Sequence, residues 1–180
     1  SLMITAWDWG NYFGDQSQRV CISSFQRPNP KSVRMEAKAC GHYVNSIMAT
    51  NEAKQRGFDE ALMLDMNGFV AEGPGANFFF EKEGVLYTPP LGNILPGITR
   101  QTVLEICREM DLPVEEKFFR PEELFEADSA FFCGTAAEVI GIDSVEGQVF
   151  NKPWKHSMGA VVQEAYKCIV LDKSYSYVIV

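Results

Sequence analysis

The sequence has 180 residues, of which 46% are hydrophobic and 22% charged, a composition typical of a globular domain with a sizeable core and not of a disordered chain. Its formal net charge of −8 argues against nucleic acid as a partner, because phosphate binding calls for a basic surface. A membrane partner is not expected either, because no apolar run reaches the roughly 18 residues of a spanning helix.

Short runs of aromatic and β-branched residues predict strands along the chain. Residues 61–73 predict a hairpin with its turn at Asn67-Gly68, and residues 77–90 predict a second hairpin with its turn at Glu83-Gly84. Further strands are expected at residues 19–25, 113–119, 129–134 and 137–142.

Three helices are expected among these strands. Residues 42–56 end at Gly57, a good left-handed cap, and residues 98–110 follow Pro96-Gly97. Residues 154–169 carry one apolar face, formed by Met158, Val161, Val162, Ala165, Tyr166 and Ile169. Hairpins with interspersed helices indicate an α+β or mixed-sheet domain.

The five cysteines are scattered and form no CxxC pair, which argues against a disulfide framework and against a zinc site. We therefore expect a cytoplasmic protein in a reducing compartment. Only two histidines are present, so we expect no metal centre built on histidine. The sequence contains no GxSxG motif, so nothing in it indicates the nucleophile elbow of a serine hydrolase.

Four glycine-bearing turns, "KACGHY", "EGPGAN", "LPGITR" and "CGTAAE", are candidate ligand-binding loops. Glycine lets the backbone approach a ligand, and successive amides in such turns form anion-binding concavities. The turn "LPGITR" is the strongest candidate, because it opens a helix whose free amides suit an anion such as phosphate. Taken singly, each turn is more often a plain turn, and Lys38 and Glu72 are more often surface residues.

Together and in order, these segments resemble the large domain of the branched-chain amino acid aminotransferases, in the fold type IV group of pyridoxal-phosphate enzymes. The matching stretches are "WDWGNY", "AKACGHY", "EAKQRGFDEALMLD", "GFVAEGPGANFFF", "LYTPP", "ILPGITR" and "CGTAAEVIGI". They run from about residue 5 to about residue 145, and the combination is far more specific than any single piece. The resemblance implies an α+β domain with a mixed, barrel-like sheet and surrounding helices.

The resemblance also implies a site for pyridoxal 5′-phosphate. Lys38 matches the catalytic lysine that binds this cofactor covalently, and Tyr43 matches the tyrosine that hydrogen-bonds its phenolic oxygen. Glu72 matches the carboxylate that pairs with the pyridine nitrogen and keeps it protonated, so that the ring accepts electrons. Ile98 and Thr99 match the phosphate-binding turn.

Further positions match the substrate side of the family's site. Thr135 adds a phosphate contact, and the Thr135-Ala136 backbone lies where the family holds the substrate carboxylate. Trp9 and Tyr12, with Tyr43, match the aromatic wall of the side-chain pocket, which suits a branched aliphatic side chain better than a charged one.

Two positions depart from the family pattern. His42 stands where asparagine is common, and Ala76 stands where glutamate or serine is usual. Both flank residues matched to the cofactor, so we expect them to influence substrate preference.

The family carries a small N-terminal domain of more than a hundred residues, which supplies an arginine to the phosphate. We expect residues 1–14 to be the interdomain segment, residues 15–180 to be the cofactor-binding large domain, and the sequence to be a fragment without the small domain. A homodimer is expected, because the family's sites lie near a dimer interface.

The predicted function is an aminotransferase that moves an amino group between a branched-chain L-amino acid and a 2-oxo acid. The alternatives are a D-amino acid aminotransferase, an aminodeoxychorismate lyase of the same fold, and a truncated fragment that binds cofactor without catalysis. The stretch "GTAAEV" favours the branched-chain type, because the D-specific enzymes tend to threonine or serine there and the lyases to a "TNS"-like segment.

Overall fold

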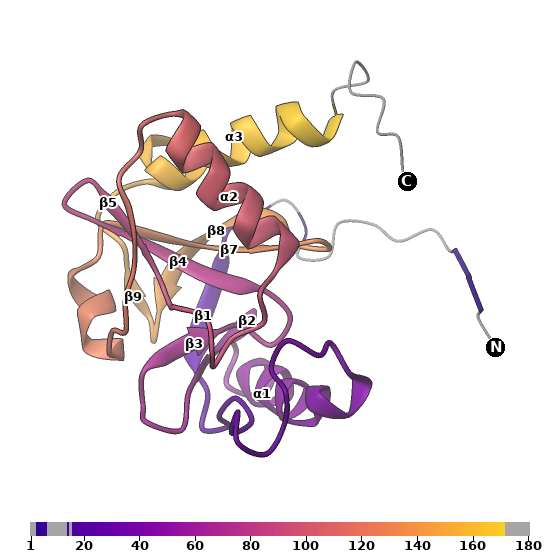
Figure 1. The fold of residues 1–180 in the computed structure, drawn as a ribbon. Helices are drawn as coiled ribbons and strands as arrows, with labels where there is room; N and C mark the ends of the chain where they lie inside the picture. Colours follow the sequence, from indigo (N-terminus) through magenta and orange to yellow (C-terminus); the bar gives the residue numbers. More distant parts are fainter. Residues whose placement is uncertain (1–2, 7–13, 15, 172–180) are drawn as a thin grey trace.

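The computed structural model describes residues 3–6, 14 and 16–171, and all the elements below lie within them (Figure 1). The strands are β1 (Gln18–Ile22), β2 (Glu60–Leu64), β3 (Val70–Glu72), β4 (Asn77–Lys82), β5 (Val85–Thr88), β6 (Val114–Glu116), β7 (Ser129–Gly134), β8 (Glu138–Val145) and β9 (Gln148–Val149). The α-helices are α1 (Val44–Gln55), α2 (Ile98–Glu109) and α3 (Met158–Leu171), and the 3-10 helices are η1 (Cys40–Tyr43), η2 (Pro121–Glu126) and η3 (Trp154–His156). None of these helices is long and apolar enough to cross a membrane.

In the described residues the strands form one mixed sheet that closes on itself. The order is β3-β2-β1-β8-β7-β4, and β3 also pairs with β4, so these strands make a barrel. Strands β5 and β6 extend the sheet beyond β4, and β9 pairs with β8. The β1–β2 and β5–β6 pairs are parallel, and α1 and α2 supply the crossover connections that such pairs need. The expected α+β fold with a barrel-like mixed sheet is confirmed.

Alternate residues along the strands face the barrel interior and the outer helices. Phe78 and Phe80 of β4 pack in the interior, whereas Phe79 packs outside with residues of α2 and α3. In the same way Leu62 of β2 points inward and Met63 packs against α1. Because side chains alternate with a period of two residues, a strand that is covered on both faces is apolar throughout. Figure 1 shows α2 and α3 together on one side of the sheet and α1 on another.

Both predicted hairpins are confirmed, because β2 pairs antiparallel with β3 and β4 with β5. The turn between β4 and β5 has positive φ at Glu83 (52°) and Gly84 (77°), the geometry of the tight turns that suit the twist of a hairpin. The strand expected at residues 113–119 pairs only over β6, because the chain then turns inward to bury Phe119. The strand expected at residues 137–142 continues to Val145.

The three predicted helices are present with altered ends. Helix α1 ends before Gly57, whose φ of +82° makes it the expected left-handed cap, and it is preceded by η1. The third helix is interrupted at Ser157, whose Oγ accepts a hydrogen bond from the Ala160 amide, so α3 begins at Met158. The expected apolar face is wrong at Val161, which is 45% exposed, whereas Val162 and Tyr166 are buried.

Candidate active site

Three neighbouring strands bring the polar residues of the site together. Glu72 at the end of β3 is the register partner of Asn77 at the start of β4, and Asn77 is in turn the partner of Cys133 in β7. The chain continues from these strand ends into the 73–76 turn and the segment after Gly134. These connections therefore meet at one end of the barrel, beside the N-terminus of α2.

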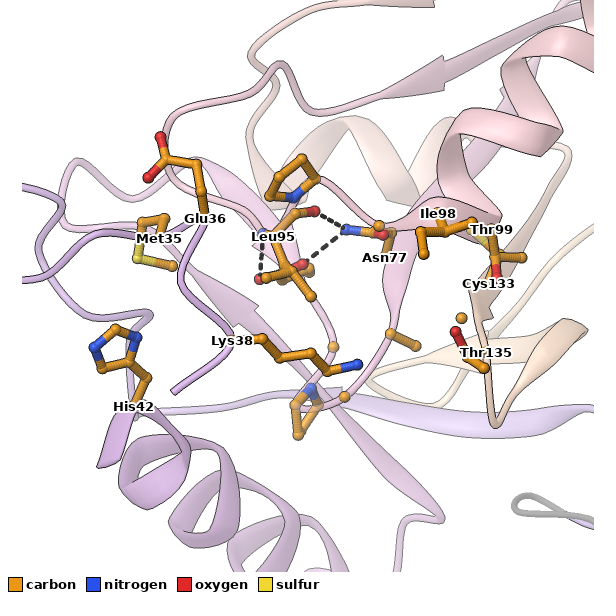
Figure 2. Close-up of a pocket in the computed structure, with 18 of the residues that line it drawn as sticks. Met35, Glu36, Lys38, His42, Asn77, Leu95, Ile98, Thr99, Cys133 and Thr135 are labelled. Carbon is orange, nitrogen blue, oxygen red and sulfur yellow. Dashed lines mark hydrogen bonds between the residues drawn. The ribbon is translucent and has the colours of Figure 1, made fainter. Parts of the chain in front are cut away.

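A cavity of about 210 Å³ opens at this end of the barrel (Figure 2). Its lining includes six of the residues singled out from the sequence: Lys38, Tyr43, Glu72, Ile98, Thr99 and Thr135. In Figure 2 Thr99, Cys133 and Thr135 lie on one side, whereas Met35, Glu36 and His42 lie on the other. With Arg27 included, the lining comes from five separate stretches of sequence: residue 27 and residues 35–43, 72–77, 95–99 and 133–135.

Glu72 is a buried carboxylate with three neighbours. Asn77 Nδ2 donates to its Oε2 at 2.8 Å and the Leu95 amide donates to its Oε1 at 3.0 Å, as the dashed lines in Figure 2 mark. Arg27 Nε lies 3.0 Å from Oε1 and forms an ion pair with it. Burial raises the pKa of Glu72 to about 7, and the Arg27 charge and the two hydrogen bonds oppose that rise.

Lys38 lies across the cavity, in the segment that leads into η1. Its side chain is exposed at the cavity mouth, and Figure 2 shows it extending into the cavity. Ala39 is extended and η1 begins at Cys40, so the chain enters the helix directly after the lysine. Tyr43, the last residue of η1, is partly buried and lines the same cavity. The structure therefore supports an amine placed in a pocket over an ordinary surface lysine.

The N-terminus of α2 points its first amides at the cavity. Gly97 is the N-cap residue and brings no capping side chain, which leaves the amides at Ile98 and Thr99 for a ligand. A Cβ on Gly97 would lie 2.1 Å from Asn77 Oδ1, so only glycine allows this approach. Asn77 Nδ2 also donates to the Leu95 carbonyl at 2.9 Å. One asparagine thus joins the helix opening to Glu72.

The remaining sequence predictions have different outcomes. Thr135 lines the cavity, whereas Ala136 is exposed beside it and, within the described chain, does not line it. Trp9 and Tyr12 lie outside the described residues, so their placement at the substrate pocket stays a prediction. His42 and Ala76 both line the cavity; His42 is partly buried and Ala76 is buried.

Sequence reasoning missed Arg27, Asn77 and the Leu95 backbone. Arg27 belongs to a short segment after β1 in which no motif marks it, and only its pairing with Glu72 gives it a role. Asn77 had a usable signal, because it closes the glycine turn that follows Glu72 and begins a buried strand. Leu95 acts through its amide, which no side-chain pattern identifies.

The site has the donor set for a ligand that carries an anion and a polar ring. It offers an amine, a phenol, a buried carboxylate and an uncapped helix N-terminus within one cavity. A cysteine nucleophile is not part of this set, because burial raises the pKa of the Cys133 thiol and keeps it protonated. Among the residues that the structure describes, no three His, Cys, Asp or Glu side chains gather in a way that would hold a metal ion.

The family model and the similar proteins named below are all aminotransferases. Residues 1–145 match the family model described as amino-transferase class IV. The branched-chain-amino-acid aminotransferase of Pseudomonas aeruginosa is 41% identical over 180 residues, which cover 98% of this chain and 59% of that protein.

Solved structures agree with this match. The crystal structure of the branched-chain aminotransferase from the archaeon Thermoproteus uzoniensis with norvaline has a TM-score of 0.89 and 42% identity, over 95% of this chain and 58% of that one. The structure of the branched-chain amino acid aminotransferase from Thermobaculum terrenum in its PLP form has a TM-score of 0.84 and 37% identity, over 87% and 52% of the two chains. This chain therefore spans less than two thirds of the length of each of these three proteins.

Proposed function

The chain belongs to the class IV aminotransferase family, and we propose that it supplies the pyridoxal-5′-phosphate site of an enzyme that exchanges an amino group between a branched-chain L-amino acid and a 2-oxo acid. The observation that carries the proposal is the convergence of Lys38, Tyr43, Glu72 and the N-terminus of α2 on one cavity. The relatives' names, which specify branched-chain substrates, support the substrate class.

The residues of the cavity fit this cofactor. Lys38 offers an amine for its aldehyde, and the uncapped amides at Ile98 and Thr99 offer donors for its phosphate. Glu72 is a buried carboxylate that can face a ring nitrogen, and Tyr43 offers a donor for the phenolic oxygen. When bound, the cofactor supplies an electron-accepting ring that stabilises negative charge at the substrate Cα.

Each side chain then has a defined task. Lys38 Nζ would hold the cofactor covalently, and the lysine amine would move a proton at the substrate Cα. Glu72 holds the proton on the ring nitrogen, because a carboxylate beside that nitrogen stabilises the charged form. Tyr43 orients the ring through its hydroxyl, and the α2 amides fix the phosphate end. Thr135 lines the cavity, and by the family resemblance the backbone at Thr135 and Ala136 would hold the substrate carboxylate.

The charges of the described lining residues favour an aliphatic substrate side chain. The cationic lining residues are Lys38, which has the cofactor as partner, and Arg27, which is paired with Glu72. In the described part of the lining, neither cation is left to pair with a second substrate carboxylate, so an apolar side chain is the better fit. Trp9 and Tyr12 would add aromatic walls. D-amino acid transamination and a lyase reaction remain the rival chemistries of this cavity.

A comparison of amino donors tests the substrate class. Leucine, isoleucine and valine should lead as L-amino acid donors, glutamate should serve through the shared half-reaction, and D-alanine should be poor. Steady-state kcat/KM is measured for each donor with the same preparation of the protein. A preference for D-alanine would overturn the substrate assignment.

Sedimentation of the same samples tests the proposed homodimer.

Replacing Gly97 by alanine should weaken cofactor binding by about 30-fold. The added Cβ would displace Asn77, which makes two hydrogen bonds of roughly 1 kcal/mol each to Glu72 and to the loop before α2. Gly41→Ala is the matched control, because a Cβ at Gly41 meets nothing within 4 Å. Cofactor affinity is read from fluorescence titration. Equal affinities of the two variants would mean that the glycine approach does not shape the site.

A further inference from the structure

Arg27 is a buried arginine that the proposed catalytic scheme leaves without a task. Its side chain is 8% exposed, and its Nε lies 3.0 Å from Glu72 Oε1. Its Nη1 donates to Ser46 Oγ at 3.1 Å, and Ser46 is itself buried on α1. A buried guanidinium costs free energy unless it is paired, so its presence behind this carboxylate calls for a role.

The segment that carries Arg27 is fixed at both sides of the residue. The Arg27 amide donates to the Leu64 carbonyl at 2.9 Å, which continues the β1–β2 pairing past the end of β1. Asn45 Nδ2 of α1 donates to the Gln26 carbonyl at 2.8 Å. Arg27 is therefore held between the barrel and α1, and its guanidinium has little freedom to leave Glu72.

We propose that Arg27 is a positioning residue that keeps Glu72 a carboxylate, orients it in the cavity, and couples it through Ser46 to helix α1. Helix α1 follows η1, which begins two residues after Lys38 and ends with Tyr43. The contact thus links the carboxylate on one wall of the cavity to the helix that carries the opposite wall. The idea that Glu72 faces a ring nitrogen rests on the proposed function. The contact between Arg27 and Glu72 is independent of that function.

The other charged groups around Glu72 leave Arg27 as its main counterion. Burial raises the pKa of Glu72, and the Arg27 charge is the largest influence that lowers it, with a smaller one from Arg100 of α2. Arg100 is directed away, because its Nη2 donates to the Pro89 carbonyl and to Glu116. The further titratable groups that line the cavity are Glu36, Lys38, His42, Tyr43 and Cys133.

The test is a pH titration of Glu72 in the cofactor-free protein. The infrared absorption band of the protonated carboxyl group reports how much of Glu72 is protonated at each pH. The band is assigned by its loss in Glu72→Gln, and in the parent protein its midpoint should lie near pH 7. Arg27→Met should raise the midpoint by about 1 to 3 pH units, the range for removing an opposite charge at this distance. Arg27→Lys, which keeps a positive charge, should restore most of the parent value.

Two further variants keep the test decisive if Arg27→Met fails to fold. Ser46→Ala releases the guanidinium from α1 and should raise the midpoint by less than Arg27→Met does. Arg19→Met removes an exposed arginine–carboxylate pair with Asp59, and it should leave the midpoint unchanged. A Ser46→Ala midpoint equal to that of the parent would overturn the coupling to α1.

Two results would overturn the role of Arg27 itself: an unchanged midpoint in Arg27→Met, or equal shifts in the methionine and lysine variants. The titration needs no cofactor, so its result is independent of the proposed function. A shifted midpoint in a protein that binds no pyridoxal 5′-phosphate would support the Arg27 role and refute the enzyme assignment. In the holoenzyme, the ¹⁵N resonance of labelled cofactor should report less protonated ring nitrogen in Arg27→Met than in Arg27→Lys.

Discussion

Lys38→Ala should abolish transamination, lowering kcat by at least about 10²- to 10⁴-fold, the contribution typical of a positioned acid–base group. In the proposed mechanism, the variant lacks both the amine that would hold the cofactor covalently and the amine that would move the proton at the substrate Cα. It should fold normally, because the Lys38 side chain is exposed and makes no buried contact that alanine would remove. Turnover with leucine, the visible absorption band and thermal melting are measured together.

Lys54→Ala is the matched control for this result. Lys54 is also exposed and lies in the last turn of α1, away from the residues that line the cavity. Its loss should leave turnover and the absorption band unchanged. If Lys38→Ala kept the band of a lysine-bound cofactor, another amine would have to hold the cofactor, and the assignment of Lys38 would be refuted.

Glu72→Gln should reduce kcat more than it reduces cofactor affinity. The amide cannot stabilise a proton on the ring nitrogen, and losing a charge-assisted hydrogen bond of roughly 1.5–3 kcal/mol corresponds to about a 10- to 150-fold fall in kcat. The phosphate donors proposed at the N-terminus of α2 are unchanged in this variant, so the dissociation constant of the cofactor should change less. Unchanged kcat, measured with saturating cofactor, would show that Glu72 has no role in the chemistry.

The same variant should change how stability depends on pH in the cofactor-free protein. Burial raises the pKa of Glu72 from its ordinary value of 4.5 to about 7, so between these values the folded protein holds a proton that the unfolded chain has released. The stabilising contribution of that proton is full below pH 4.5 and is lost as the pH rises to 7. The parent should therefore lose about 3 kcal/mol relative to Glu72→Gln across this window. Parallel curves from urea unfolding would contradict this expectation.

Local chemistry made the two hairpin turns and the C-terminal cap of α1 predictable. The Asn67-Gly68 and Glu83-Gly84 turns, and the cap at Gly57, depend on residues next to one another in sequence, and all three are confirmed. The closure of the barrel was not predictable in the same way from turn signals. It depends on the pairing of β1 with β8 and of β4 with β7, which join distant parts of the chain.

The candidate site shows the same division. The family resemblance selected Lys38, Glu72 and Thr135, and the fold brings all three to one cavity. Neither spacing nor resemblance pointed to Arg27, because its role arises from a long-range contact with Glu72 in the folded barrel. Burial of Arg27 beside a carboxylate is a property of three-dimensional packing, and a lone arginine before a proline carries no sign of it.

The central claim is that Lys38 is the amine that binds the cofactor, and chemical trapping tests it most directly. The protein is saturated with pyridoxal 5′-phosphate, the bond between lysine and cofactor is reduced with borohydride, and the modified peptide is identified by mass spectrometry. The account predicts a single modified residue, Lys38, and no modification when excess leucine is added before reduction and has converted the cofactor to its amine form. Modification of another lysine, or an equal spread over several lysines, would contradict it.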